Sequence, residues 1–504
     1  MHGDIVDGDN VVIKDSPWRE MPIAAILKVD NMYGKQGGKL LYKCIPYNKH
    51  LPVCLVPYEE KQTFSKKRVH KYVLVKVSHW RDKHPLVKLT QTFGSIDELS
   101  SLYDYLLFGL RIHTSNQRFT KEFMSLYKQI TKKAHINEIQ KRYGLEDRTA
   151  LPILTIDGET TQDFDDAIGY VSTTKDEVLS IYISNTVLWM DYLNLWEHYG
   201  DRVSSIYLPD RVVNMLPNKM GTSVCGLVEG DVSVAFAMDL HIRDKVIYRV
   251  SYHNVLIRVD CNYRYQHTTL LKSSLYQSIL MAMESLDMKV ENSYKCIEKL
   301  MIYFNSKIGD SLASYKKGIY RYCSIEEGVV KKVPLALQDF MKWQDTHSGY
   351  ALYNDTLTHY TLGVRYYTQM SSPIRRIVDM INMIEFQLNR NMCSLSQKTL
   401  AFKDNWLSKV DTINDTHRAI KQLESQTKLL KYYTTTQNAD VLVHEAYIVC
   451  KLADNKYKLY IPTLQSTGIL KVFEELPLYM KINCKLCLLQ DDINIVQKIR
   501  FIKV

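Results

Sequence analysis

Four aspartates lie within ten residues of one another in the stretch LPILTIDGETTQDFDDAIGY: Asp157, Asp163, Asp165 and Asp166. The apolar residues on either side, 151–156 and 167–171, predict two short buried strands, so the carboxylates fall where these strands enter the fold. Like charges this close repel one another or take up protons unless a cation lies among them. They offer hard oxygen ligands with no neighbouring Cys or His, which favours Mg²⁺ or Mn²⁺ over zinc. The stretch therefore predicts a divalent-metal site.

A solvated acidic turn or a calcium loop is the alternative interpretation of this stretch. An EF-hand loop needs Gly at its sixth position and amphipathic helices on both sides, and a frame beginning at Asp157 has neither. Each charged residue type makes up roughly 6% of an average chain, so four aspartates at such short spacing are uncommon by chance. The metal site remains the favoured prediction.

The composition is that of a globular protein. The chain has 504 residues, of which 46% are hydrophobic and 24% charged, with a net charge of +10 that weakly favours a polyanionic partner. It contains no apolar run long enough for a membrane span and no secretory signal. Its ten scattered cysteines form no CxxC or Cys/His ligand pattern, which predicts free thiols. We therefore expect an intracellular, cytoplasmic protein, and a nuclear location is also compatible.

Strand-like and helix-like patterns divide the chain into regions. Up to residue 95, short runs rich in Val, Ile, Leu and Tyr alternate with polar turns and predict a small barrel of the OB or cold-shock kind. A helical pattern and then a large mixed section follow, and strand patterns return from about 440 to predict a second small barrel. The predicted barrel strands are 21–29, 39–47, 51–58 and 70–80 in the first barrel and 441–452, 456–462, 466–473 and 483–490 in the second.

A second charged motif, SSPIRRIVDM, begins with helix-start signals. Ser372 suits the N-cap and Pro373 the first helical position, which predicts Arg375 and Arg376 in the first turn of a helix. Two cations at that end oppose the helix dipole, but beside free N–H groups they form a concentrated anion site. The alternative is that both side chains extend into solvent. Because an acidic metal cluster is present in the same chain, we favour a phosphate clamp.

The two motifs resemble the signatures of the RNase II superfamily of RNB-domain exoribonucleases, the family of RNase R. TIDGETTQDFDDAI is similar to the catalytic signature, and YYTQMSSPIRRIVDM is similar to the signature usually written YTHFTSPIRRYxD. SSIYLPDRVVNMLP resembles the stretch YLPDRVIPMLP between them. The resemblance covers nearly the whole chain and implies an α+β fold, in which an RNB catalytic domain is flanked by small OB-type barrels.

The resemblance also implies the domain order. We expect a cold-shock-like barrel at 1–95 with a remnant of a preceding barrel at 1–15, a helical connector at 96–145, the RNB domain at 146–436 and an S1-like barrel at 437–504. His2-Gly3-Asp4 resembles the closing strand of the family's first cold-shock barrel, so we expect that barrel and any PIN domain to be missing.

The activity implied by the resemblance is processive 3′-to-5′ hydrolysis of single-stranded RNA to nucleoside 5′-monophosphates with Mg²⁺, for which Mn²⁺ is a possible substitute. By this resemblance all four aspartates would surround the metal, and Asp165 is the one that hydrolysis requires and RNA binding does not. Arg375 would contact the scissile phosphate, and Arg376 beside it would also bind RNA.

Two further RNA-binding residues come from the resemblance. Tyr207, in IYLP, would stack on the 3′-terminal nucleotide, a contact that tolerates any base. Glu424, in QLESQ, matches a glutamate in the helix before the terminal barrel. The alternatives are a core tyrosine and a solvated helix face.

Several positions depart from the family pattern. Gln369 and Met370 replace a His-Phe pair, Ile377 replaces an aromatic, Met383 replaces a common His, and Asn185 replaces an Asp. None is a predicted metal carboxylate or the phosphate arginine, so we expect catalysis to survive.

Two rival functions remain open. One is a catalytically silent RNA-binding scaffold of the same fold, and the other is an endonuclease that uses the same metal site. We expect single-stranded RNA as the partner, no membrane, and a monomer with possible association with an RNA-degradation complex.

Overall fold

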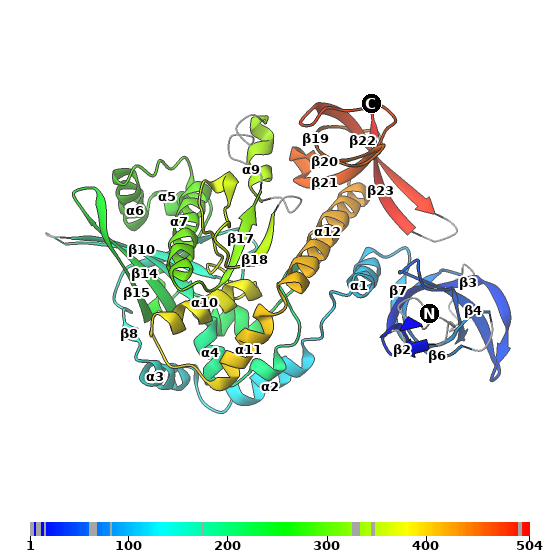
Figure 1. Cartoon of the computed structure of the whole chain (residues 1–504), viewed down its shortest axis with the longest axis horizontal. Coiled ribbons are helices and arrows are strands. Elements are labelled where there is room, and N and C mark those ends of the chain that lie inside the picture. The colour runs from blue at the N-terminus through cyan, green and yellow to red at the C-terminus, as the bar shows by residue number, and fades with distance from the viewer. Residues whose placement is uncertain are drawn as a thin grey trace. The chain divides into compact units, whose positions relative to one another are not determined.

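The computed structural model describes residues 5–6, 12–14, 17–59, 68–80, 83–173, 176–324, 333–343, 348–491 and 496–504 (Figure 1). The chain divides into two compact units. Unit 1 comprises Met1–His113, Tyr207–Arg211 and Ala419–Val504, and unit 2 comprises Thr114–Ile206 and Val212–Arg418. Of the predicted barrel remnant at 1–15, only β1 (Ile5–Val6) and β2 (Val12–Lys14) are described, and they pair antiparallel. His2-Gly3-Asp4 lies outside the described residues.

The first barrel of unit 1 is closed, with strand order β3-β4-β5-β7-β6. Its strands are β3 (Ile23–Gln36), β4 (Lys39–Pro46), β5 (Cys54–Tyr58), β6 (Lys71–His79) and β7 (Leu86–Ser95). Alternate residues of β3, namely Ile23, Ala25 and Leu27, fill its interior against Val73 and Val75 of β6. Four of these strands were predicted. The fifth, β7, closes the barrel by pairing antiparallel with β6 and parallel with β5.

The second barrel repeats this topology, with strand order β19-β20-β21-β23-β22. Its strands are β19 (Val443–Ala453), β20 (Lys456–Ile461), β21 (Ser466–Lys471), β22 (Lys481–Asp491) and β23 (Val496–Lys503). The closing strand β23 was again not predicted. Leu429 of the long helix α12 (Val410–Thr435) packs into the core of this barrel.

Unit 2 is built on a seven-stranded sheet of order β16-β9-β10-β11-β14-β15-β8. The strands are β8 (Glu146–Asp147), β9 (Ile153–Asp157), β10 (Asp166–Ser172), β11 (Glu177–Ser184), β14 (Val232–Arg243), β15 (Val246–Arg258) and β16 (Cys261–Arg264). Alternation along β14 sends Val234, Phe236 and Met238 to the large core under the helices, and Ala235 and Ala237 to a smaller cluster on the other face.

Helices cover the large core. They are α2 (Gln117–Tyr127), α3 (Lys132–Tyr143), α4 (Thr186–Tyr192), α5 (Thr268–Leu271), α6 (Ser274–Ser285), α7 (Ser293–Ser314), α10 (Ile377–Asn389) and α11 (Gln397–Leu407). Helix α10 packs against α4, α7 and α11 (Figure 1). The other elements are α1 (Leu99–Gly109), α9 (Leu335–Trp343), β12 (Ile206–Tyr207), β13 (Val212–Val213), β17 (Ile319–Cys323) and β18 (Ser348–Leu352).

The architecture is the mixed α+β class that was predicted, with closed five-stranded barrels. The domain boundaries at 95, 145 and 436 stay predictions. No helix in the described part of the chain is long and apolar enough to cross a membrane. All ten cysteines are free, as the scattered pattern predicted.

Asp191, at the end of α4, ties three helices of unit 2 together. Its carboxylate is 2% exposed and accepts hydrogen bonds from Arg142 Nη2 at 3.3 Å, Tyr143 Oη at 2.7 Å and the Ser396 N–H at 2.9 Å. The Thr399 hydroxyl also donates to it. Burial alone would raise the pKa of this carboxyl, but the donors from Ser396, Thr399 and Tyr143 outweigh burial and lower the pKa.

Replacing Asp191 should therefore destabilise unit 2. We expect Asp191→Ala to lower the free energy of unfolding by about 3 kcal/mol at pH 7, because four donors lose a buried acceptor. Since the folded-state pKa is lowered, the contribution is complete above the ordinary aspartate pKa of about 3.9 and is lost as pH falls through the folded pKa. Urea unfolding of both proteins checks this. The control is Asp201→Ala, which removes an 80% exposed side chain paired with Lys409 and should cost less than about 0.5 kcal/mol.

Candidate active site

The acidic stretch forms the loop between β9 and β10. Asp157 ends β9 and Asp166 begins β10, and residues 158–165 belong to neither strand. Backbone hydrogen bonds fix the loop where it meets the sheet, since Phe164 O accepts from Leu227 N at 3.0 Å and Asp165 O accepts from Ser184 N at 2.8 Å. The Phe164 side chain is buried. The loop backbone therefore carries Asp165 into the protein.

Asp165 is the centre of the site. Its side chain is 1% exposed, Oδ1 accepts from the Ile374 N–H at 2.9 Å, and Oδ2 accepts from Arg375 Nε at 2.9 Å. Arg375 also donates through Nη2 to the Ser372 hydroxyl at 3.1 Å, and its side chain is 42% exposed. The structure thus brings the two sequence motifs together through one buried carboxylate and one partly exposed guanidinium.

Burial sets the electrostatics of the carboxylates. It raises the pKa of Asp165 to about 8, against the charge of Arg375, which lowers it. Burial also raises the pKa values of Asp157 and Asp166, and the charge of Asp157 adds to the rise at Asp166. Asp163 is half-buried. The cluster therefore favours an added positive charge.

The carboxylate oxygens of the four aspartates are the kind of ligand that a hard divalent cation prefers. Oδ2 of Asp157 is buried and has no hydrogen-bond partner among the described residues, an arrangement that favours a bound cation. The side chains are not gathered around one point, however. Within the described ranges, no group of three or more His, Cys, Asp or Glu side chains is placed to hold a metal ion. Asp165 is directed toward Ile374 and Arg375 instead.

The prediction that a helix begins at Pro373 is wrong. Helix α10 begins at Ile377, and Arg376 precedes it in extended conformation, with φ −140° and ψ 129°. The cause is a strand-like contact with residues 203–205, because Ser205 N donates to Arg375 O at 3.0 Å and Ile377 N donates to Val203 O at 2.9 Å. Both arginines therefore lie in the turn before the helix. Arg376 Nη2 donates to Asp379 Oδ1 at 2.8 Å.

Three buried polar side chains form hydrogen bonds with the backbone around the arginine turn, and the sequence patterns assigned none of them a role. Asp379 Oδ1 also accepts from Ser372 N at 2.7 Å. Asn382 donates to the carbonyls of Gln369 and Ile319, both at 2.9 Å, and accepts from Ile319 N at 2.8 Å. Asn305 of α7 accepts from Met370 N at 2.9 Å. The available signal for Asp379 and Asn382 was the presence of Asp and Asn in the largely apolar helix α10, where a buried polar side chain needs partners.

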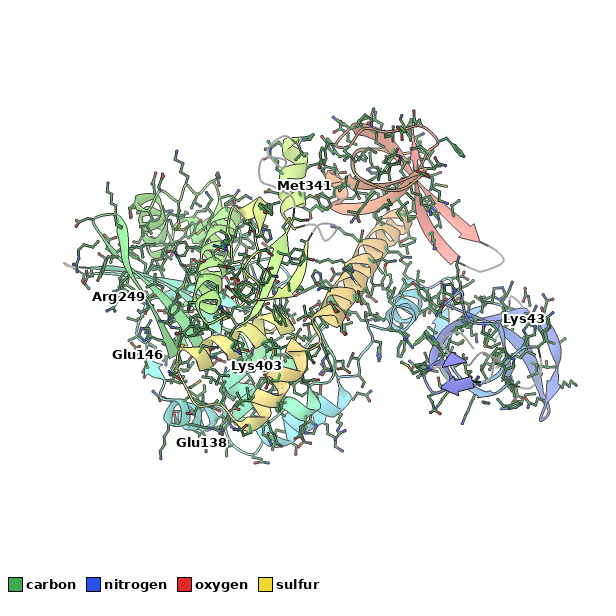
Figure 2. All side chains as sticks on the ribbon, viewed as in Figure 1. Lys43, Glu138, Glu146, Arg249, Met341 and Lys403 are labelled. Carbon is green, nitrogen blue, oxygen red and sulfur yellow. The ribbon has the colours of Figure 1, made fainter. Side chains whose placement is uncertain are left out.

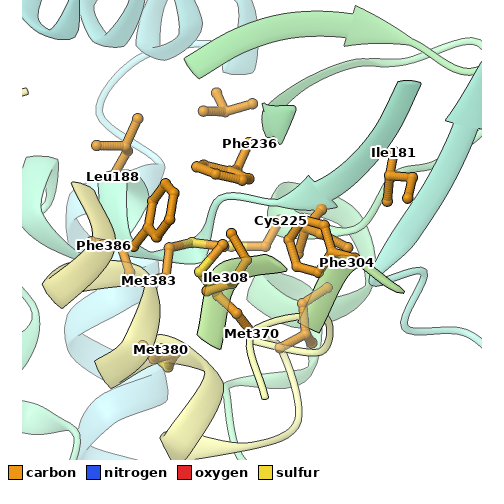
Figure 3. Close-up of a cluster of buried hydrophobic side chains, with 14 of the residues drawn as sticks. Ile181, Leu188, Cys225, Phe236, Phe304, Ile308, Met370, Met380, Met383 and Phe386 are labelled. Carbon is orange, nitrogen blue, oxygen red and sulfur yellow. The ribbon is translucent and has the colours of Figure 1, made fainter. Parts of the chain in front are cut away.

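The positions that depart from the family pattern are buried. Gln369 is 8% exposed and accepts a hydrogen bond from the Tyr350 hydroxyl at 2.6 Å. Met370, Ile377 and Met383 are fully buried, and Figure 3 shows both methionines in the apolar cluster of unit 2. Asn185 caps α4 through Leu188 N and donates to Asn254. Survival of catalysis with these replacements stays a prediction.

Tyr207 and Glu424 lie together in unit 1, whereas the aspartates and arginines belong to unit 2. Tyr207 is 43% exposed, which excludes the core-tyrosine alternative. Its backbone N–H donates to Glu424 Oε1 at 3.0 Å, so Glu424 is more than a solvated helix residue. Their roles in RNA binding stay predictions.

Comparison with known proteins finds one matching family. Residues 145–277 match the RNB domain. Together with relatives named exoribonuclease 2 and ribonuclease R, this match supports the predicted RNase II superfamily. It is 23% identical over 380 residues to exoribonuclease 2 of Psychromonas ingrahamii, covering 58% of this chain and 56% of that protein. The chain thus spans about half the length of this curated relative.

Solved structures share the fold of this RNB-domain chain. RNase R of Mycoplasma genitalium, in complex with ribose-methylated single-stranded RNA, aligns with a TM-score of 0.71 at 16% identity, covering 98% of this chain and 91% of that one. Yeast Ssd1, a pseudonuclease, aligns with a TM-score of 0.57 at 13% identity, covering 94% and 67%. The predicted superfamily and fold class are confirmed, and the fold alone is compatible with an active or an inactive protein.

The buried amide of Asn382 gives a test of the support beneath the arginines. We expect Asn382→Leu to lower the free energy of unfolding by about 2–4 kcal/mol, because backbone groups of Ile319 and Gln369 lose buried partners. Met383→Leu, at the next position of the same helix, is the control and should cost less than about 1.5 kcal/mol. Equal losses in the two variants, measured by urea unfolding, would show that packing volume and not the amide matters.

Proposed function

We propose that this chain is a 3′-to-5′ exoribonuclease that degrades single-stranded RNA processively to nucleoside 5′-monophosphates. The observation that carries the proposal is the 2.9 Å contact between Asp165 of the acidic loop and Arg375 of the arginine turn. In the proposed reaction, carboxylates and a phosphate-binding guanidinium act at the same site. Asp165 and Arg375 are 210 positions apart in sequence, and the fold brings them into contact. The RNB domain and the relative named exoribonuclease 2 support the same reaction class.

Three residues of unit 2 would have different roles at the scissile phosphate. Arg375, partly exposed, would bind a phosphate oxygen and stabilise the charge that develops on it in the transition state. Asp165 holds Arg375 through Nε and so orients the guanidinium. Arg376, anchored on buried Asp379, adds positive charge beside it.

Mg²⁺, or Mn²⁺ in its place, is the cofactor that we propose. Its ligands would come from Asp157, Asp163, Asp165 and Asp166, and Asp157 offers a buried oxygen with no hydrogen-bond partner among the described residues. The described side chains are not gathered around one point, so binding would require them to move closer together. When bound, such an ion supplies positive charge to phosphate oxygens and makes a coordinated water more acidic.

Tyr207 would hold the base of the terminal nucleotide. Its exposed ring suits stacking, which is independent of base identity and therefore fits a sequence-independent enzyme. Glu424 fixes the backbone at Tyr207 through the N–H bond.

A catalytically silent RNA-binding scaffold is the second candidate, because the pseudonuclease Ssd1 has this fold. The buried aspartates favour the enzyme. A scaffold gains nothing from carboxylates that lose hydration and repel one another.

Hydrolysis can be tested with a 5′-labelled oligoadenylate and Mg²⁺. We expect steady shortening of the labelled strand from its 3′ end, with release of unlabelled monophosphates, and both should stop on addition of EDTA. Asp165→Asn should lower the rate by on the order of 10³-fold or more, because it loses a charged ligand, while RNA affinity changes little. Gel-shift titration measures the affinity. A stable wild-type complex with no degradation would establish the scaffold and reject the enzyme.

Whether hydrolysis starts at an end of the RNA has its own test. A circular RNA of the same sequence has no free end, so we expect it to survive under conditions that degrade the linear RNA. Electrophoresis of both substrates in one reaction provides the comparison. Linearisation of the circle would instead establish an endonuclease.

A further inference from the structure

Arg264, the last residue of β16, lies beside the acidic loop and has no role in the activity described so far. Strand β16 pairs parallel with β9, and in that register Arg264 is the partner of Asp157. The pairing places an arginine next to the residue at which the loop begins. The Arg264 side chain is half-buried.

The Arg264 guanidinium contacts the loop at three points. Nη1 donates to Gly158 O at 2.6 Å and lies 3.3 Å from Thr161 O. The guanidinium carbon lies 5.6 Å from the centre of the Phe164 ring, within cation–π range. The contacts cover the start and middle of the loop and the residue directly before Asp165.

The loop needs such support because local structure gives it little. Residues 158–165 form no strand, and the backbone bond from Thr161 N to Gly158 O, at 3.1 Å, closes a single turn. Carboxylates at both ends of the loop repel one another. Burial raises the pKa of Asp157, and the charge of Arg264, together with Thr155 and Arg375, opposes that rise.

We propose that Arg264 is a positioning residue for the acidic site: its guanidinium clamps the Gly158–Phe164 segment so that Asp157 and Asp165 keep their places. The proposal rests on the exoribonuclease function for its kinetic consequence. Arginine suits the task because one guanidinium nitrogen donates to two carbonyls while the planar group lies within cation–π range of Phe164. The competing role is direct binding of an RNA phosphate by the guanidinium, and the kinetic constants of the variants separate the two roles.

Three substitutions distinguish the hydrogen bonds that Arg264 donates to the loop from the effect of its positive charge alone. Arg264→Lys keeps the charge with a single donor group, Arg264→Gln keeps a donor without charge, and Arg264→Met keeps neither. We expect Arg264→Met to lower kcat by roughly 10- to 100-fold on oligoadenylate, while KM changes less than about threefold, because the carboxylates are displaced and RNA contacts remain. Arg264→Lys and Arg264→Gln should each recover part of kcat.

Arg249→Met is the matched control. Arg249 is an exposed arginine of β15 in the same sheet, labelled in Figure 2, and its guanidinium contacts His241. We expect its kinetic constants to equal those of wild type. A rise in KM with unchanged kcat in Arg264→Met, with a smaller salt dependence of RNA binding, would overturn the clamp and assign Arg264 to an RNA phosphate.

Hydrogen exchange of the full chain tests the clamp without any hydrolysis. We expect amides of residues 158–164 to exchange at least about tenfold faster in Arg264→Met, with exchange in the barrels unchanged. Unchanged exchange in this loop would overturn the proposal. If the wild-type chain fails to hydrolyse RNA, the proposed function is rejected, and this exchange measurement still decides whether Arg264 clamps the loop.

Discussion

Burying several carboxylates at the end of one strand is costly, because each loses hydration and repels the others. The chain offsets this cost with donors from distant segments. Asp165 receives a backbone N–H and a guanidinium from the arginine turn, and Arg264 lies beside Asp157. The acidic loop and the arginine turn are therefore not two separate features. Each supplies hydrogen-bond partners for charged or polar groups of the other.

The arginine turn depends in the same way on groups beneath it. Asp379 binds both the Ser372 N–H and Arg376, so one buried carboxylate fixes the beginning and the end of the turn. The contact of Arg375 and Ile377 with residues 203–205 fixes it from another side. If Arg375 binds a phosphate as we propose, a backbone fixed in this way reduces the conformational freedom lost on binding, which is the physical basis of preorganisation.

Local patterns in the sequence predicted much of this structure, and tertiary contacts account for the failures. Runs rich in Val, Ile, Leu and Tyr predicted four strands of each barrel, whereas β7 and β23, which carry many polar residues and close the two barrels, were not predicted. Ser372 and Pro373 are sound helix-start signals, yet the contact with residues 203–205 holds Arg376 extended and delays the helix. No local pattern marks Arg264. Its contact with Gly158 spans 106 positions and exists only because β16 pairs with β9.

The departures from the family pattern show which atoms the site requires. At positions 369 and 370 a His-Phe pair has become Gln-Met, yet the bonds that hold this segment use the Gln369 carbonyl and the Met370 N–H. These are backbone groups, which any residue other than proline supplies. The side chains have only to fill the space beneath, and Met370 is completely buried while Gln369 gains a bond from Tyr350. The side chain itself matters at Asn305, Asp379 and Asn382. These three side chains form the hydrogen bonds with the backbone of residues 369, 370 and 372. Sequence identity can therefore fall at the first set of positions without moving the guanidinium, whereas a change at the second set removes its support.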